Sequence, residues 1–334
     1  MSRPPCSCGT IRASSAATAG TAARASARHG ADPALPVPIR TEAEIDGIAR
    51  AGEIGARALA AGFAAARPGA STREVDRAVE REIRAAGARA IFRGLRPAPH
   101  APPFSGVACV CLNEEAVHAV PRDDRLIRAG DLLTIDTGIE LDAWCADLAW
   151  TEPVAPGEGP APGRSERLAS AARAVVEAAL AAIAPGVRWS AVSAGVLAKA
   201  QELGFDLIPG FAGHGIGRRL HEPPRARLER PAVEPGSDDD FTLRPGMVLT
   251  VEPILTEPVR TEPEPEPDAP VRDSARHPGT SPPEPPATMD MGDGWTVATR
   301  GGGWACHEER TVAVVRGGCR VLTPRWEVVG LENR

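Results

Sequence analysis

Tyrosine is absent from this chain of 334 residues, and Lys199 is its only lysine although 38 residues are basic, which we interpret as coding bias. No apolar run approaches the ~18 residues that a membrane-spanning helix needs. The formal net charge is −6, so there is no excess of basic residues that would indicate nucleic acid or an anionic membrane as a partner.

Disulfide and structural zinc frameworks are not predicted either. The seven cysteines are an odd number, and no C-x-x-C pair occurs. We therefore expect a reducing, cytoplasmic location. Residues 1–40 are rich in Ala, Ser and Arg and lack the apolar segment of a secretory signal. We expect a disordered tail there, and an organelle transit peptide of similar composition is the alternative.

One folded domain is predicted over 41–334. Capping boxes at Thr41/Glu44 and Ser71/Glu74 begin two helices, which end near Ala66 and Gly87. Residues 256–292 are dense in proline and acid and are predicted to form a flexible insertion. The other expected elements are an extended stretch at 106–121, a β-hairpin at 131–151, and helices at 165–184 and 190–203.

A weak internal repeat is visible at an offset of 117 residues. The motif around Pro68-Gly69, with two valines and a glycine after it, recurs at Pro185-Gly186. Either the matches are chance among Ala-rich helices, or a helix–helix–strand unit is duplicated and a site lies between the halves.

Four acids lie inside or beside strand patterns: Asp136, Asp147, Glu252 and Glu309. A hairpin turning at Leu141-Asp142 would place Asp136 directly opposite Asp147, with Cβ atoms roughly 5 Å apart. Like charges there would destabilise the sheet unless a cation lay between them, and two bridged metal ions fit that separation. The alternative is that these acids are exposed strand residues or turn caps.

One histidine completes this set. His214 lies in GFAGHGIGRRLHEPP (210–224), with glycines on both sides. Four carboxylates and a neutral imidazole balance two divalent cations. Oxygen-rich ligation with one imidazole favours Mn, Fe, Co or Zn over copper or an iron–sulfur cluster.

Five motifs in order resemble type I methionine aminopeptidases: NEEAVHAVP (113–121), TIDTGIELDAWCAD (134–147), GHGIG with HEPP (213–224), LRPGMVLTVEP (243–253) and GWTVAT with EERTV (294–312). The resemblance covers about residues 41–327. It implies an α+β pita-bread fold, in which a pseudo-two-fold antiparallel sheet is backed by helices.

The resemblance also implies roles for individual residues. The metal ligands would be Asp136, Asp147, His214, Glu252 and Glu309, with Asp147 and Glu309 bridging two ions, and Glu309 preferred over Glu308. His118 and His221 would contact the scissile amide and its carbonyl. Glu252 would carry a proton to the leaving amine. Cys109, Phe104 and Trp295 would line the methionine pocket, and the glycines would let the backbone pass close to the metals.

The implied activity is metal-dependent removal of the N-terminal methionine from nascent proteins with a small second residue. The substrate is a peptide or nascent-protein N-terminus. Association with the ribosome and a monomeric state are further expectations. Three departures from the family pattern are Ala119, Leu148 and Leu220, each of which could alter the pocket or the rate.

Other interpretations remain. Proline-directed aminopeptidases share this fold but usually have a long N-terminal domain. A non-catalytic pita-bread binding protein would typically lack ligands that are all present here. A phosphate-binding loop at 210–224 is not supported, because no Lys-Ser/Thr follows the glycines. The acidic run 237–240 lacks the alternation of a calcium loop.

Overall fold

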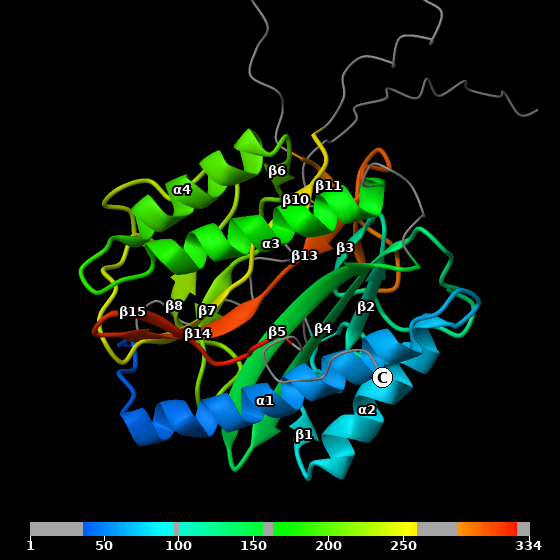
Figure 1. The fold of residues 1–334 in the computed structure, drawn as a ribbon, viewed down its shortest axis with the longest axis horizontal. Coiled ribbons are helices and arrows are strands. Elements are labelled where there is room, and N and C mark those ends of the chain that lie inside the picture. The colour runs from blue at the N-terminus through cyan, green and yellow to red at the C-terminus, as the bar shows by residue number, and fades with distance from the viewer. Residues whose placement is uncertain (1–35, 97–99, 156–162, 259–285, 326–334) are drawn as a thin grey trace, which may run out of the picture.

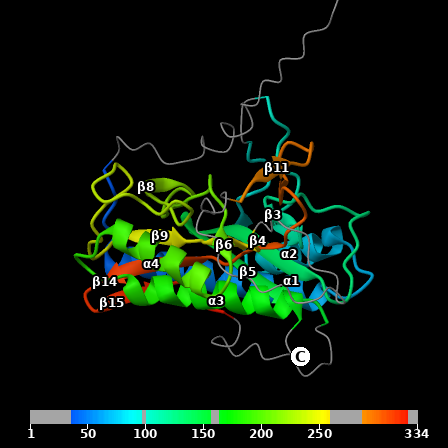
Figure 2. The same ribbon diagram turned by 90° about the horizontal axis from the view of Figure 1, so that it is seen from above.

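Two pairs of helices cover one side of an antiparallel β-structure (Figures 1 and 2). The computed structural model describes residues 36–96, 100–155, 163–258 and 286–325. The predicted tail lies almost wholly outside these ranges, as do residues 259–285 of the predicted insertion. Among the described helices, none combines the length and the apolar character that a membrane crossing needs.

The four predicted helices are all present. Thr41 and Ser71 cap the first two through capping boxes with Glu44 and Glu74, as the sequence predicts. Each box satisfies backbone N–H groups that the first turn of a helix leaves free. The helices are α1 (Glu42–Ala65), α2 (Thr72–Ala85), α3 (Arg164–Ala182) and α4 (Trp189–Glu202).

The internal repeat is a structural one. Both ends of α4 are shifted by 117 residues from those of α2 (72 to 189, 85 to 202), and the strands that follow keep the same offset. These are β1 (Arg89–Ala90) and β6 (Asp206–Leu207). The repeated valines are buried in both copies. The second helix and the strand of the unit thus recur at the same offset in the structure, which favours duplication over chance similarity.

The first half of the molecule is built on a hairpin of β4 (Leu132–Leu141) and β5 (Trp144–Pro153), with β1 and β2 (Cys109–Leu112) paired to β4. The second half holds a five-stranded sheet ordered β15-β14-β9-β7-β8. Its strands are β7 (Gly213–Gly215), β8 (Glu222–Ala226), β9 (Val248–Val251), β14 (Arg310–Val315) and β15 (Gly318–Val321).

Two three-stranded sheets complete the fold. One has the order β13-β10-β6 and the other β11-β12-β3. Residues 288–290 form a strand, so the prediction of a loop throughout 256–292 is wrong there. The new strands are β3 (Glu115–Val117), β10 (Ile254–Thr256), β11 (Thr288–Asp290), β12 (Val297–Thr299) and β13 (Ala305–His307).

The hairpin register differs from the expected one. Asp136 pairs with Ala149 and Asp147 with Gly138, so the two aspartates are diagonal neighbours rather than directly opposed. The turn residues are Asp142 and Ala143, both with positive φ (51° and 60°), as a tight two-residue hairpin turn requires. Because side chains alternate with a period of two, this two-residue shift leaves both acids on the same face.

Asp76 connects α2 to the strand that leads into the site. Its buried carboxylate accepts hydrogen bonds from the backbone N–H groups of Val107 (2.7 Å) and Ala108 (3.0 Å). Burial raises the pKa of Asp76, and the two amides oppose that rise. The chain that precedes Cys109 is therefore held by a side chain of the helix.

The variant Asp76→Ala should destabilise the protein, because each buried amide left without a partner costs about 1–3 kcal/mol. Urea unfolding measures the loss. Asp46→Ala is the matched control, since Asp46 is exposed on α1 and pairs with Arg320 at 2.8 Å. That surface pair should contribute less than about 1 kcal/mol. Equal effects of the two substitutions would contradict the anchoring role.

Candidate metal centre

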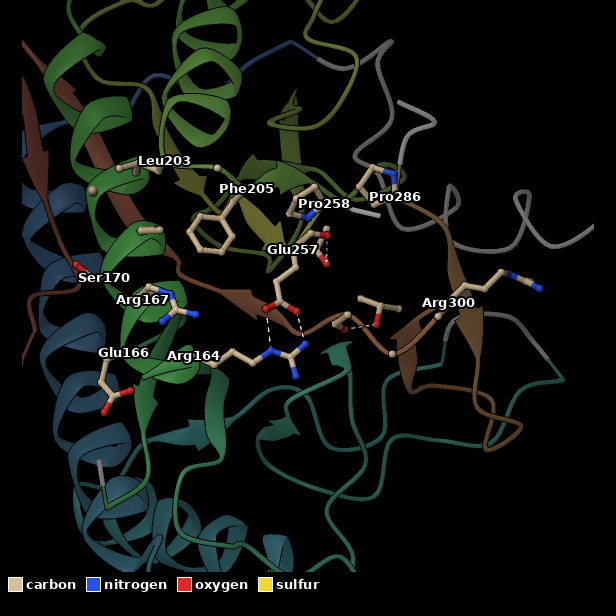
Figure 3. Close-up of a pocket in the computed structure, with 18 of the residues that line it drawn as sticks. Arg164, Glu166, Arg167, Ser170, Leu203, Phe205, Glu257, Pro258, Pro286 and Arg300 are labelled. Atoms are coloured by element: carbon tan, nitrogen blue, oxygen red, sulfur yellow. Dashed lines mark hydrogen bonds and ion pairs between the residues drawn. The ribbon is translucent and has the colours of Figure 1, made fainter. Parts of the chain in front are cut away.

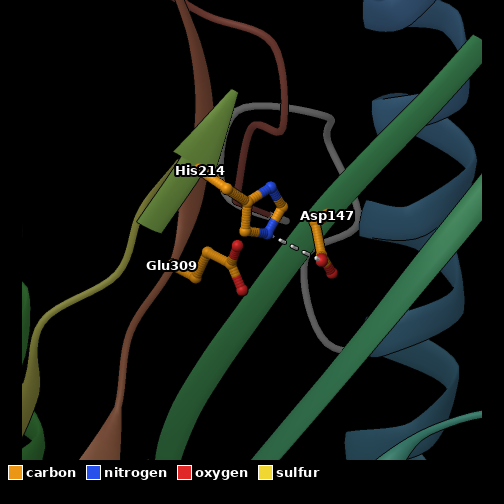
Figure 4. A group of neighbouring side chains, drawn as sticks. All are labelled: Asp147, His214 and Glu309. Carbon is orange, nitrogen blue, oxygen red and sulfur yellow. Dashed lines mark ion pairs between the residues drawn. The ribbon is translucent and has the colours of Figure 1, made fainter. Parts of the chain in front are cut away.

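Three buried side chains from distant parts of the sequence meet between the two halves (Figure 4). Asp147 lies on β5, His214 on β7, and Glu309 directly before β14. One ligand atom of each lies within 4.8 Å of the others, and all three residues are buried. The distance from His214 Nε2 to Asp147 Oδ2 is 3.9 Å. A carboxylate–imidazole–carboxylate group at this spacing can hold a metal ion.

Backbone hydrogen bonds fix the two carboxylates relative to each other. The Glu309 N–H donates to the carbonyl of Ala149 at 2.9 Å, which joins β5 to the start of β14. The Thr311 hydroxyl donates to the Asp147 carbonyl (2.7 Å) and accepts from the Asp147 N–H (3.0 Å). The strands on which the two acids lie are therefore tied at three points beside the site.

The remaining two predicted ligands border this group. Asp136 is paired with Cys109 across β2 and β4 and shares a face with Asp147. Glu252 follows β9, and its Oε1 lies 3.8 Å from His214 Nε2. Thr250 donates to that same oxygen and accepts from the His214 N–H at 3.0 Å. One hydroxyl thus orients both Glu252 and His214.

Burial and mutual repulsion strongly disfavour ionisation of these acids. Desolvation raises the pKa of Asp136, of Asp147 and of Glu309 well above the usual range, and the neighbouring carboxylates raise it further. Burial raises the pKa of Glu252 to about 7. A divalent cation would reverse this balance, because its charge holds carboxylates ionised.

The polar atoms of the site fit a metal. Among the described residues, Asp136 Oδ1 and Glu309 Oε1 are buried without a hydrogen-bond partner. Such atoms are costly unless something binds them. His214 Nδ1 lies 3.0 Å from the Gly215 carbonyl, a contact that places the proton on Nδ1 and leaves the Nε2 lone pair free. Burial lowers the pKa of His214 to about 4, so the ring is neutral.

Two of the predicted substrate residues, His221 and Cys109, lie beside proposed ligands, and the other three contact one another. The His221 ring lies 4.4 Å from that of His214, centroid to centroid. Phe104 and Trp295 make an edge-to-face contact at 5.1 Å, and the ring of His118 lies 6.3 Å from that of Trp295. Cys109 is buried beside Asp136. The structure therefore places His221 beside His214 and Cys109 beside Asp136, and it joins Phe104, Trp295 and His118 in a separate set of ring contacts.

Known proteins were compared with this sequence and fold. Residues 46–315 match the profile of metallopeptidase family M24. The chain belongs to that family. It is 35% identical over 293 residues to methionine aminopeptidase 1 of Mycobacterium tuberculosis, covering 86% of this chain and 95% of the relative. It is 35% identical to methionine aminopeptidase of Treponema pallidum, covering 87% and 98%.

Solved structures of the family have the same pita-bread fold. Methionine aminopeptidase from Thermotoga maritima superposes with a TM-score of 0.71 at 27% identity, covering 87% of this chain and 100% of that one. Prolidase from Pyrococcus horikoshii superposes with a TM-score of 0.59 at 21% identity. There the match covers 86% of this chain but 63% of the prolidase.

The glycines beside His214 are required by the packing of β7. A Cβ at Gly213 would lie 2.6 Å from the Thr250 carbonyl oxygen, and one at Gly215 would lie 2.1 Å from that of Pro223. They are required because β7 is packed tightly against its neighbours. Because these glycines have no side chain, β7 can lie close to the backbone of the neighbouring segments in the sheet that holds the M24 site.

Two of the three departures from the family pattern lie in the core. Leu148 is fully buried on the opposite face of β5 from Asp147 and packs against Gly55 of α1. Ala119 is also buried, and its carbonyl accepts from the Val110 N–H at 3.2 Å. Leu220 is partly buried beside His221 and packs against the core of the first half.

Alternation along the segment that joins β13 to β14 distinguishes two adjacent glutamates. Glu308 is buried away from the cluster, where it accepts from the Thr151 N–H (3.0 Å) and pairs with Arg310 (2.9 Å). Glu309 faces Asp147 and His214. The same alternation brings His307, two residues earlier, to the side of Glu309. Sequence analysis missed His307, although its position two residues before Glu309 could have indicated it.

The large cavity in Figure 3 is a separate feature. Its volume is about 1220 Å³, and none of the site residues named above lines it. Arg164 Nε donates to Glu257 Oε1 at 2.7 Å across it. The M24 site is a cluster of buried polar atoms and not this open cavity.

Removing one carboxylate should weaken metal binding. Asp136→Asn should lower the affinity for Mn²⁺ or Co²⁺ at least tenfold, because an amide brings no charge to the ion. Isothermal titration of metal-free protein measures the change. Asp142→Asn, at the exposed turn of the same hairpin, should bind as wild type. A wild-type protein that binds no divalent ion would contradict the metal centre.

Proposed function

We propose that this protein is a methionine aminopeptidase that removes the N-terminal methionine from proteins with a small second residue. One observation supports this best. The buried Asp147–His214–Glu309 group can hold a metal ion, and Phe104 and Trp295 form an edge-to-face aromatic pair. The chain also matches the full length of a methionine aminopeptidase structure. Thioether side chains pack well against aromatic rings, which suits methionine.

Two divalent ions, of Co, Mn, Fe or Zn, would be held by Asp136, Asp147, His214, Glu252 and Glu309. When bound, such a pair supplies Lewis acidity and an activated water. Four carboxylates with one imidazole match these metals in ligand type.

The chain's own residues then orient the substrate and move protons. His221 would donate to the scissile carbonyl oxygen and stabilise the negative charge that develops there. His118 would contact the amide of the same bond. Glu252 would deliver a proton to the nitrogen of the leaving amine. Phe104, Cys109 and Trp295 would hold the methionine side chain and so select it.

A proline-directed activity is the alternative within the fold, because prolidases superpose on this chain. It is less favoured, since the chain matches only 63% of the prolidase chain but all of the Thermotoga methionine aminopeptidase. A non-catalytic binding role is not favoured, because residues of the ligating type stand at all five proposed ligand positions. Cytoplasmic location, a monomeric state and contact with the ribosome are further proposals.

The protein loaded with Mn²⁺ or Co²⁺ should release methionine from Met-Ala-Ser and leave Ala-Pro-Ala intact. Amino-acid analysis of the products measures this. Chelator should abolish the release, and His214→Ala should reduce it by more than about a hundredfold, since an ion and its activated water would be lost. Cleavage of Ala-Pro-Ala alone would replace this proposal with the proline-directed one, and cleavage of neither by metal-loaded protein would favour a binding role.

The pocket can be tested separately from the metals. Trp295→Ala should lower kcat/KM for Met-Ala-Ser by about tenfold or more, because burying a large apolar side chain is worth about 1.5–3 kcal/mol. Metal affinity should not change. Trp304→Ala is the control, since Trp304 stacks with Arg164, a residue that lines the cavity of Figure 3. Equal losses in both variants would show a general structural effect instead of substrate recognition.

A further inference from the structure

His307 is a second imidazole beside the proposed metal centre. It ends β13, pairs with Ile254 of β10, and is 5% exposed. Its Nε2 is buried and, among the described residues, is one of the few side-chain atoms without a hydrogen-bond partner. A buried ring nitrogen without a partner lowers the stability of the fold unless it binds a ligand.

The distances around Nε2 are those of atoms that share an ion. It lies 3.7 Å from Glu309 Oε2 and 3.9 Å from Glu252 Oε2. Both distances are too long for a hydrogen bond. Donor atoms bound to one ion at ~2.1 Å are separated by about 3–4 Å, depending on the angle between the bonds. The distances fit a cation between the three groups.

The imidazole of His214, the histidine proposed above as a ligand, lies at similar distances from two carboxylates. His214 Nε2 lies 3.9 Å from Asp147 Oδ2 and 3.8 Å from Glu252 Oε1. The carboxylate of Glu252 therefore separates the two rings, with one oxygen toward His214 and the other toward His307. His307 Nε2 therefore lies at about the same distance from two carboxylates as His214 Nε2 does.

We propose that His307 Nε2 is a further ligand of the metal centre, so that two imidazoles and not one bind metal. This inference rests on the dinuclear centre of the proposed function and deepens it. A neutral imidazole is the form that binds metals. A second nitrogen shifts the donor set further toward Mn, Fe, Co and Zn and away from Mg.

Counting the nitrogens on a bound ion tests the proposal without relying on activity. Pulsed EPR of the wild-type protein loaded with Mn²⁺ should show hyperfine coupling from two imidazole nitrogens. His307→Gln, which keeps a neutral polar side chain, should show one, and so should His214→Gln. Titration should show Mn²⁺ affinity reduced about 10–100-fold in each variant. Circular dichroism checks folding, and His307→Asn serves if the first variant does not fold.

One coupled nitrogen in the wild-type protein, unchanged in His307→Gln, would overturn the proposal. So would unchanged Mn²⁺ affinity in a folded variant, including the case where only KM for Met-Ala-Ser rises and His307 contacts substrate. The two proposals fail separately. Protein that binds Mn²⁺ through two nitrogens but does not cleave Met-Ala-Ser would disprove the peptidase assignment alone.

Discussion

Mutual repulsion among buried carboxylates is the constraint on which the rest of this structure depends. Asp136, Asp147, Glu252 and Glu309 are gathered where water is excluded, and burial raises the pKa of each. Without a cation this arrangement opposes folding, so the scaffold must hold the acids in place against their repulsion. The tightly paired β4–β5 hairpin and the five-stranded sheet provide that rigidity from opposite sides.

Hydroxyls perform much of the fine positioning. Thr250 connects the His214 backbone to the Glu252 carboxylate, and Thr311 both donates to and accepts from the Asp147 backbone. Each is fully buried and contacts a proposed ligand or its backbone. A hydroxyl can donate and accept at once, so one small side chain orients two groups without adding charge to a site already crowded with it.

The sequence was sufficient for the helices and the repeat, because capping boxes and buried valines at fixed spacing depend on local chemistry. It was insufficient for the hairpin register. Residues Asp142 and Ala143 adopt positive φ, which neither strongly signals, and so the turn begins one residue later than expected. The face of Asp136 was still predictable, since a shift of two preserves it. The strand at 288–290 depends on pairing with β12, a non-local contact that composition does not encode.

Alternation also explains why a single short segment supplies several different functions. In the run from His307 to Arg310, odd positions face the metal cluster and Glu308 faces a buried network with Arg310 and Arg325. Both faces of this segment carry charged side chains, and both are buried. A shift of the segment by one residue would turn Glu308, which pairs with Arg310 and Arg325, toward the metal cluster. The ion pairs on the far face thereby fix the register of the residues on the near face.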